Sequence, residues 1–439
     1  MSTRTSLPHR AGALLLLVLP FAHRSARAQA TPPDSLRLGA LLSAAERRDP
    51  RTRQLALREA QSALRLRSIA AERLPAIAGN AQAQHQSVVT EFPGGPGAGP
   101  RALPHDTYDA NVTVTEPLLD PSRSARAAAE KAQLAKARAE VLTAVYATRR
   151  QVNASFFALA SLGARHEALS TTIDDLEAQA RVLASRVRNG AALAGDLAAV
   201  RAELLRRRQD DAQLLADRAA AARVLAELTD APIDTAAPAA LPELADEVAR
   251  ARAADSLRAR PEYERFAAMR DALARQADVL GAETRPRVSA FARGGAGKPG
   301  LDMLSTRVEP YWIGGVQVQW SPFDWGRSAR ERQTLALERD VVDTEAESFR
   351  DALARETVAD LATIDRLERA LATDEEIVSL RAEIVRETAA RFRESAVTSA
   401  EYVDTQTDLL AARIARAQHR VELAQARASY LTTLGLEVR

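Results

Sequence analysis

An internal duplication constrains this chain more than any other feature, because both halves carry the same landmarks in the same order. In each half a helical stretch gives way to a strand-like one, a strand runs into the start of a long helix, and that helix is later interrupted. Matched landmarks at one period indicate a repeated structural unit. Three pairs of segments match: 74–77 with 285–288, 112–126 with 316–330, and 186–190 with 391–395.

The stretches between these landmarks predict long packed helices. Apolar residues such as Val141, Val145 and Val152 recur with a heptad-like spacing, and Val358, Ile364 and Ile384 belong to a second such series. This spacing is typical of helices that pack along one seam. A helix of roughly 65 residues would be roughly 100 Å long, close to the length of two shorter helices placed end to end. Each repeat is therefore expected to supply one continuous strut and one two-piece strut.

The predicted elements fall into two repeats and a linker. The first repeat is predicted at 31–230, with a helix at 35–73, a β-hairpin at 75–117, a long helix at 122–189 and a return helix at 193–228. The second is predicted at 243–439, with a helix at 243–284, a β-hairpin at 286–322, a long helix at 327–394 and a return helix at 399–434. An equatorial linker rich in Ala and Pro, 229–242, joins them.

The strand that ends the second hairpin carries a membrane signal. Its even positions are apolar, with Trp312 and Trp320 at the two ends, and Gln317 and Gln319 lie on its odd positions. Eight residues of strand cover about 26 Å, which matches the apolar band between the aromatic girdles of an outer-membrane barrel. For this strand alone, an ordinary amphipathic strand of a soluble sheet is an equally good interpretation.

Export and barrel geometry then favour the membrane interpretation. Residues 1–30 combine a basic start, a short apolar stretch and small residues before Thr31, which predicts a secretory signal peptide. No later stretch is long and apolar enough for a transmembrane helix. A sheet in lipid cannot leave an edge unpaired, and four strands are too few to enclose a lumen. We therefore expect a barrel that is shared between copies of the chain.

Composition excludes several kinds of chemistry. The chain has no cysteine, so disulfides and thiolate sites are excluded. The 60 Lys and Arg residues are interleaved with 58 Asp and Glu residues, which predicts solvated and paired helix faces and no nucleic-acid partner. The four histidines that follow the predicted signal peptide are scattered and are interpreted as solvated surface residues; they are His85, His105, His166 and His419. Residues 294–299 lack the glycine and hydroxyl positions of a phosphate loop. We expect no catalysis, no cofactor and no metal.

At these residues the sequence resembles the TolC-type outer-membrane efflux family. The resemblance covers the duplicated unit, the strand exits at 117–120 and 322–327, and the two helix breaks. It implies a mostly α chain with a small β part, whose homotrimer forms a long α-helical barrel and a shared transmembrane β-barrel. It also implies an outer-membrane location with a periplasmic extension, and docking onto a periplasmic adaptor and an inner-membrane transporter. The implied function is a passive export duct of a tripartite efflux or type I secretion system.

The resemblance also implies an acidic constriction just after the second helix break. Glu401 and Asp404 take the two acidic positions there, and Asp196 is the first-repeat equivalent of Glu401. Residues one helical turn apart share a face, and rings of carboxylates favour cations. Alternatively, Thr398 and Glu401 form a capping box at a helix start.

The helix-break tips are predicted at Asn189, Gly190 and Ser395. Gates in the family often include an aromatic-to-arginine contact beside this break. The chain departs from that pattern, because Phe392 replaces a hydroxylated aromatic residue and Val397 replaces the basic partner.

Two other classes of protein compete with the duct. A periplasmic adaptor also has long helical hairpins, but it would show one hairpin between Gly-rich β-sandwich halves. A soluble coiled-coil scaffold would not need Pro-interrupted β-hairpins.

Overall fold

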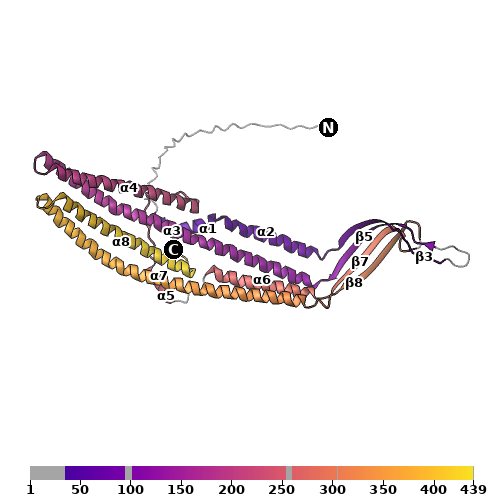
Figure 1. Ribbon diagram of the computed structural model, residues 1–439. Helices are drawn as coiled ribbons and strands as arrows, with labels where there is room; N and C mark the ends of the chain where they lie inside the picture. The colour runs from indigo at the N-terminus through magenta and orange to yellow at the C-terminus, as the bar shows by residue number, and fades with distance from the viewer. Residues whose placement is uncertain (1–34, 94–100, 254–259, 304, 439) are drawn as a thin grey trace, which may run out of the picture. The chain divides into compact units, whose positions relative to one another are not determined.

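The computed structural model describes residues 35–93, 101–253, 260–303 and 305–438. The predicted signal peptide, 1–30, lies outside these residues. Residues Ser35–Arg439 form one compact unit, which is mostly helical with a small amount of sheet, as predicted (Figure 1).

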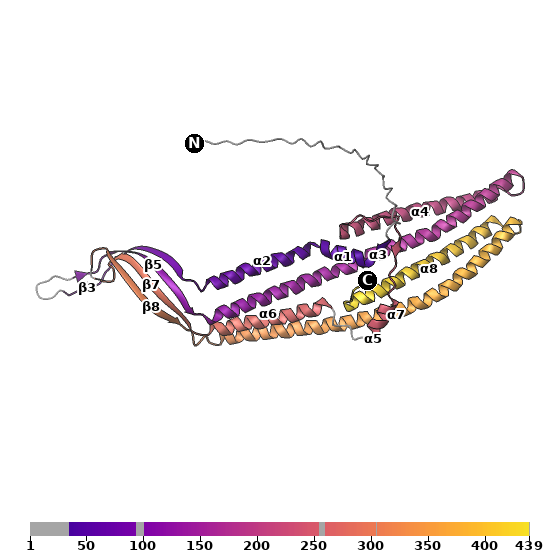
Figure 2. The same cartoon turned by 180° about the vertical axis from the view of Figure 1, so that it is seen from behind.

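Two long helices and two return helices make up most of the unit. They are α3 (Pro121–Arg188), α4 (Ala194–Thr229), α7 (Arg327–Arg393) and α8 (Ser399–Leu434). An aspartate side chain caps the start of each long helix. The Asp120 carboxylate accepts a hydrogen bond from the Ser122 amide at 3.0 Å. The Asp324 carboxylate accepts one from the Ser328 amide at 2.8 Å. Such caps satisfy amides that have no partner inside the helix. Each long helix packs against its own return helix, α3 with α4 and α7 with α8 (Figures 1 and 2).

Both helix breaks have the same backbone geometry. Gly190 and Ser395 adopt left-handed conformations, with φ of 70° and 59°. The next amide in each case, that of Ala191 or Ala396, donates to a carbonyl five residues back, at 2.8 and 2.9 Å. This Schellman arrangement ends a helix by satisfying its last carbonyls. The two repeats therefore reverse direction through the same turn.

The helices that lead into the strands are each made of two pieces, so the prediction of single helices at 35–73 and 243–284 was wrong. The pieces are α1 (Leu38–Arg48) and α2 (Pro50–Ala71), then α5 (Ala245–Ala253) and α6 (Pro261–Glu283). Pro50 and Pro261 each occupy the first turn of the second piece. Proline has no amide hydrogen and restricts the residue before it, so a helix cannot continue through these positions.

Four antiparallel strands form one sheet in the order β2-β5-β7-β8. They are β2 (Ala76–His85), β5 (Asp106–Leu119), β7 (Arg287–Lys298) and β8 (Glu309–Gln319). The β5–β7 pairing joins the hairpin of one repeat to the hairpin of the other. Two pairs of short strands form separate two-stranded sheets. In one, β1 (Leu36–Arg37) pairs with β6 (Ala239–Ala240) of the linker, and in the other β3 (Glu91–Phe92) pairs with β4 (Arg101–Ala102).

The main apolar core lies where α1, α3, α4, α5, α7 and α8 meet. Phe156 and Phe157 of α3 pack edge to face, and Ile364 of α7 and Leu431 of α8 are fully buried beside them. The predicted seam of α3 is buried, including Val141, Val145 and Val152. The predicted seam of α7 is buried only at Ile364; its other apolar residues include Val358, Ile377, Leu380 and Ile384, all of which are exposed.

Candidate functional site

The register of the sheet separates apolar from polar side chains. Residues paired across strands share a face, and so do alternate residues along a strand. One row runs from Ile77 through Val114 and Ala292 to Gly314. The apolar face also includes Ala81, Ala110, Val112, Ala290, Trp312, Val316 and Val318. Its charged residues are Glu116 and, at the loop end of the sheet, Asp106 and Lys298. The opposite face carries most of the polar side chains of the four strands.

Along the central strand β5, burial of the two faces is inverted relative to a water-soluble sheet. Along β5, Tyr108, Ala110 and Val112 are exposed, whereas Asp109 and Asn111 are half-buried. Soluble proteins rarely expose contiguous apolar patches, and larger ones mark interaction surfaces or membrane contact. The apolar face of this sheet therefore requires a partner of low polarity.

The polar face is held by a hydrogen-bond network that spans all four strands. Asn111 of β5 accepts from Asn80 of β2 at 3.3 Å and from Thr113 at 3.3 Å. Arg293 of β7 donates to Thr113 at 3.2 Å, and Tyr311 of β8 donates to Asp109. These bonds satisfy polar groups on the half-buried face.

The two predicted interface tryptophans differ in their surroundings. Trp312 lies within β8 and is 80% exposed. Trp320 follows β8, and its indole nitrogen donates to the Thr284 carbonyl oxygen at 3.1 Å, at the end of α6. Trp320 thus lies at the boundary between sheet and helices.

The sheet has two open edges. Among the described residues, β2 and β8 each have only one strand neighbour, β5 and β7 respectively. Open edges present unpaired backbone amides and carbonyls and can pair with another chain.

The predicted gate residues lie in the first two turns of the return helices. Asp196 is in the first turn of α4, and Glu401 and Asp404 are exposed on α8. Within the described part of the chain, none of the three carboxylates forms an ion pair, although Asp408, four residues further along α8, binds Arg381 at 2.7 Å. The Glu401 amide donates to the Thr398 hydroxyl at 3.2 Å, which is half of the predicted capping box.

Arg186 joins the two helix breaks, and the sequence reasoning missed it. Its guanidinium donates to the Ser395 hydroxyl at 3.1 Å and to the Ala191 carbonyl at 3.2 Å. The contact connects Ser395, predicted as a tip of the second repeat, with the turn of the first repeat at Asn189 and Gly190. The one sequence signal for this contact was that each break begins with an arginine, Arg186 in the first repeat and Arg391 in the second.

An apolar cluster lies behind these tips. Phe392 stacks on Tyr402 with ring centroids 5.3 Å apart, and both residues are buried with Leu183 and Val200 of the first repeat. Val397 packs against the same cluster. Thus the two residues that depart from the family pattern contribute to packing between the repeats.

Two of the histidines contact carboxylates of a neighbouring helix. His166 and His419 are half-buried and bind Asp211 and Asp374, each at 2.6 Å, between a long helix and its return helix. The interpretation of these two as solvated surface residues was wrong, because each bridges two packed helices. Across the described residues, no group of His, Cys, Asp and Glu side chains could hold a metal ion.

None of the helices in the described residues is long and apolar enough to cross a membrane. A four-stranded sheet with an exposed apolar face is joined to paired long helices. Neither a protein-family model nor a curated protein sequence matches the chain.

Solved structures identify the particular fold. CusC, described for its transmembrane channel formation, aligns with a TM-score of 0.68 at 15% identity over 91% of this chain and 92% of that one. The outer membrane protein VceC from Vibrio cholerae aligns with a TM-score of 0.66 at 17% identity over 92% and 97%. The open-state MtrE outer membrane channel of Neisseria gonorrhoeae aligns with a TM-score of 0.64 at 17% identity over 92% and 89%. The predicted resemblance to the TolC-type family is confirmed at the level of the fold.

Proposed function

We propose that this protein is the outer-membrane channel-tunnel of a tripartite efflux or type I secretion system, and that it acts as a passive export duct. The observation that carries the proposal is the sheet, whose apolar side chains gather on one largely exposed face while its polar network lies on the other. A barrel in lipid requires this distribution, with apolar residues outward and polar residues toward the lumen.

The open edges of β2 and β8 support a barrel built from several copies. A lipid-exposed edge would leave each backbone amide and carbonyl unsatisfied, at a cost of several kcal/mol per group. Pairing β8 of one copy with β2 of the next removes both edges. Three copies would supply twelve strands, above the roughly eight needed to enclose a lumen.

Exposed apolar residues on the helices support the same assembly. Leu57 and Leu64 of α2 are exposed, as are Val341, Val358 and Leu380 of α7. In Figures 1 and 2, α2 and α7 run along opposite sides of the unit. Copies arranged in a ring would bring one side against the other and bury these residues in a helical barrel.

The carboxylates of Glu401, Asp404 and Asp196 are proposed to line the periplasmic entrance. Carboxylates at the first turn of a helix lie near its positive end, and without ion-pair partners they keep their negative field. In a trimer each would form a ring that attracts cations and repels anions. A periplasmic adaptor and an inner-membrane transporter are the proposed partners, and the transporter would supply the energy.

The alternative function, a periplasmic adaptor, is disfavoured by the sheet. An adaptor works in water and has no use for four strands that expose an apolar face. Membrane fractionation and gel electrophoresis of unheated samples would test the proposal. We expect recovery with the outer membrane and a trimer that dissociates on heating. A stable monomer in the soluble periplasmic fraction would overturn the duct and leave the adaptor.

A further inference from the structure

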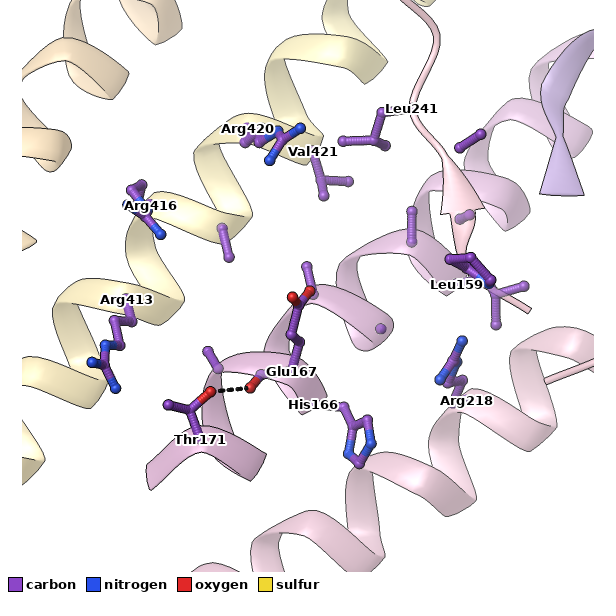
Figure 3. A pocket seen from close by; sticks show the side chains of 18 of the residues that line it. Leu159, His166, Glu167, Thr171, Arg218, Leu241, Arg413, Arg416, Arg420 and Val421 are labelled. Carbon is purple, nitrogen blue, oxygen red and sulfur yellow. Dashed lines mark hydrogen bonds between the residues drawn. The ribbon is translucent and has the colours of Figure 1, made fainter. Parts of the chain in front are cut away.

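A cavity of about 1020 Å³ lies between α3, α4, the linker that follows α4, α7 and α8. Arg413, Arg416 and Arg420 line it from α8, and Arg218 lines it from α4 on the other side (Figure 3). The three α8 arginines are spaced so that they share one helix face. Guanidinium groups from both repeats therefore border one cavity.

The cavity has more positive than negative charge. Four arginines line it, against the carboxylates of Glu167 and Glu375. Glu375 is already paired, since its carboxylate accepts from Arg416 at 3.0 Å. In the residues that the structure describes, Arg218, Arg413 and Arg420 have no carboxylate within ion-pair distance. Elsewhere on these helices arginines do pair between helices, as Arg208 does with Glu177 at 2.6 Å.

Two of the guanidinium nitrogens are buried without a partner. Arg218 Nε and Arg413 Nη1 are inaccessible to solvent and make no hydrogen bond to any described residue. Arg218 uses another nitrogen, Nη2, to donate to the Ala237 carbonyl oxygen at 3.1 Å, which fixes the side chain beside the cavity. A buried donor without a partner keeps the full cost of its desolvation, and most such groups in native proteins have a bound partner. An anion in the cavity would offset the positive charge of both guanidinium groups.

We infer that this cavity binds a multivalent oxyanion, such as a diphosphate or a tricarboxylate, that bridges Arg218 of α4 to the arginines of α8. The planar fork of a guanidinium matches phosphate and carboxylate oxygens. The cavity volume is at the upper end of the range for small-molecule sites, roughly 300 to 1,000 Å³. Among the residues that line the cavity, Glu167 is the carboxylate without an ion pair. Because it would repel an anion, the ligand is expected to bind the arginines away from Glu167. The site goes beyond the duct function, because its ligand would hold the helical hairpins of the two repeats together.

Titration calorimetry with inorganic pyrophosphate tests the site on the full-length protein in detergent at fixed ionic strength. We expect saturable binding of one pyrophosphate per chain. Arg218→Gln alone, and Arg413→Gln with Arg420→Gln, should each weaken binding at least tenfold, because each removes charge-assisted hydrogen bonds from one side of the cavity. Arg223→Gln is the matched control, since Arg223 is exposed on the same helix as Arg218 and does not line the cavity.

The outcomes separate the site from general charge and from folding. Arg420→Gln changes an exposed residue and should weaken binding without loss of helix content by circular dichroism. The inference is overturned if wild-type protein shows no saturable binding or if Arg223→Gln weakens binding as much as Arg218→Gln. Loss of affinity in the α8 variants alone would refute the bridge between repeats. Because the assay measures binding in detergent, failure of the proposed export function would leave the result unchanged.

Discussion

At the scale of single residues, the helix breaks lie beside the carboxylates that are proposed to line the periplasmic entrance. Ser395 stands in a left-handed backbone conformation that Gly190 fills in the other repeat. Serine brings a hydroxyl that Arg186 can bind, at the cost of about 1 kcal/mol or more for a side chain in that conformation. Each repeat thus uses the same turn, but only the second repeat gains a link to the first.

The carboxylates beside the breaks give the first prediction. Asp404→Ala combined with Glu401→Ala should raise the single-channel conductance and weaken the preference for cations in planar bilayers, because the negative field at the entrance is removed. The matched control is Asp246→Ala with Glu247→Ala, which removes two carboxylates from the first turn of α5. Unchanged selectivity in the first pair would refute the gate assignment.

Acid stability provides a second prediction at this scale. The hydrogen bond from Arg51 lowers the pKa of Asp49 to about 2, against the opposing effect of its burial, and Thr148 adds to the lowering. A carboxylate with a lowered pKa in the folded state stabilises the protein above its ordinary pKa, and this contribution is lost as the pH falls toward the folded value. Thermal unfolding in detergent should therefore show a loss of stability between about pH 4 and pH 2 that is smaller in Asp49→Asn. Parallel pH profiles of the two proteins would contradict this role.

At the scale of secondary-structure elements, the two faces of the sheet can be compared directly. Val316→Arg places a charge on the apolar face of β8 and should destabilise a membrane-embedded barrel by about 2–4 kcal/mol. Gln317→Arg places the same charge on the opposite face, one residue away, and should be tolerated. The amount of heat-dissociable trimer in purified membranes measures both effects. Equal tolerance of both substitutions would indicate that β8 does not face lipid.

The helix breaks allow an equally close comparison of backbone conformations. Gly190→Ala should cost about 1–2 kcal/mol, because residue 190 has positive φ. Gly195→Ala should stabilise the protein by about 0.5–1 kcal/mol, because Gly195 lies within α4. A Cβ atom added at either position meets nothing within 4 Å, so steric clash cannot explain a difference. Thermal denaturation followed by circular dichroism checks the opposite signs.

Sequence alone predicted those elements whose ends are set by local residues. The start of α8 follows from Thr398 and the start of α3 from Asp120 and Pro121, all of which act within one turn. Pro50 carried the same kind of signal for a break before α2, but the apolar pattern on both sides concealed it. The exposure of Val358 could not be predicted, because its apolar spacing is the same whether its partner is in the same chain or another.

Those parts of the candidate site that depend on local sequence were predicted, and those that depend on contacts between distant segments were not. The alternation around Trp312 is local, so it revealed one apolar face. The link between Arg186 and Ser395 joins residues of different repeats and depends on how the two hairpins pack, which no local pattern encodes. The unpaired arginines of the cavity were likewise hidden by a nearly balanced total charge, since pairing depends on which helix faces meet.

At the scale of the whole molecule, we expect assembly to depend on the edges of the sheet. Ala81→Pro in β2 removes one backbone amide from that strand. The matched substitution Ala81→Thr keeps the amide and suits a strand. We expect Ala81→Pro to reduce the trimer fraction on unheated gels while the long helices keep their circular dichroism signal. Trimers as abundant as those of Ala81→Thr would argue against strand pairing between copies through this region.

The inverted sheet also has a consequence for biogenesis. The helical part has its own buried core and can become ordered in water. In the proposed barrel, by contrast, the strands would have no stable environment until lipid and neighbouring copies reach them together. Such a subunit would travel through the periplasm with folded helices and unfinished strands. Its insertion into the membrane and its oligomerisation would then be a single event, driven by the same backbone groups and by the same apolar side chains.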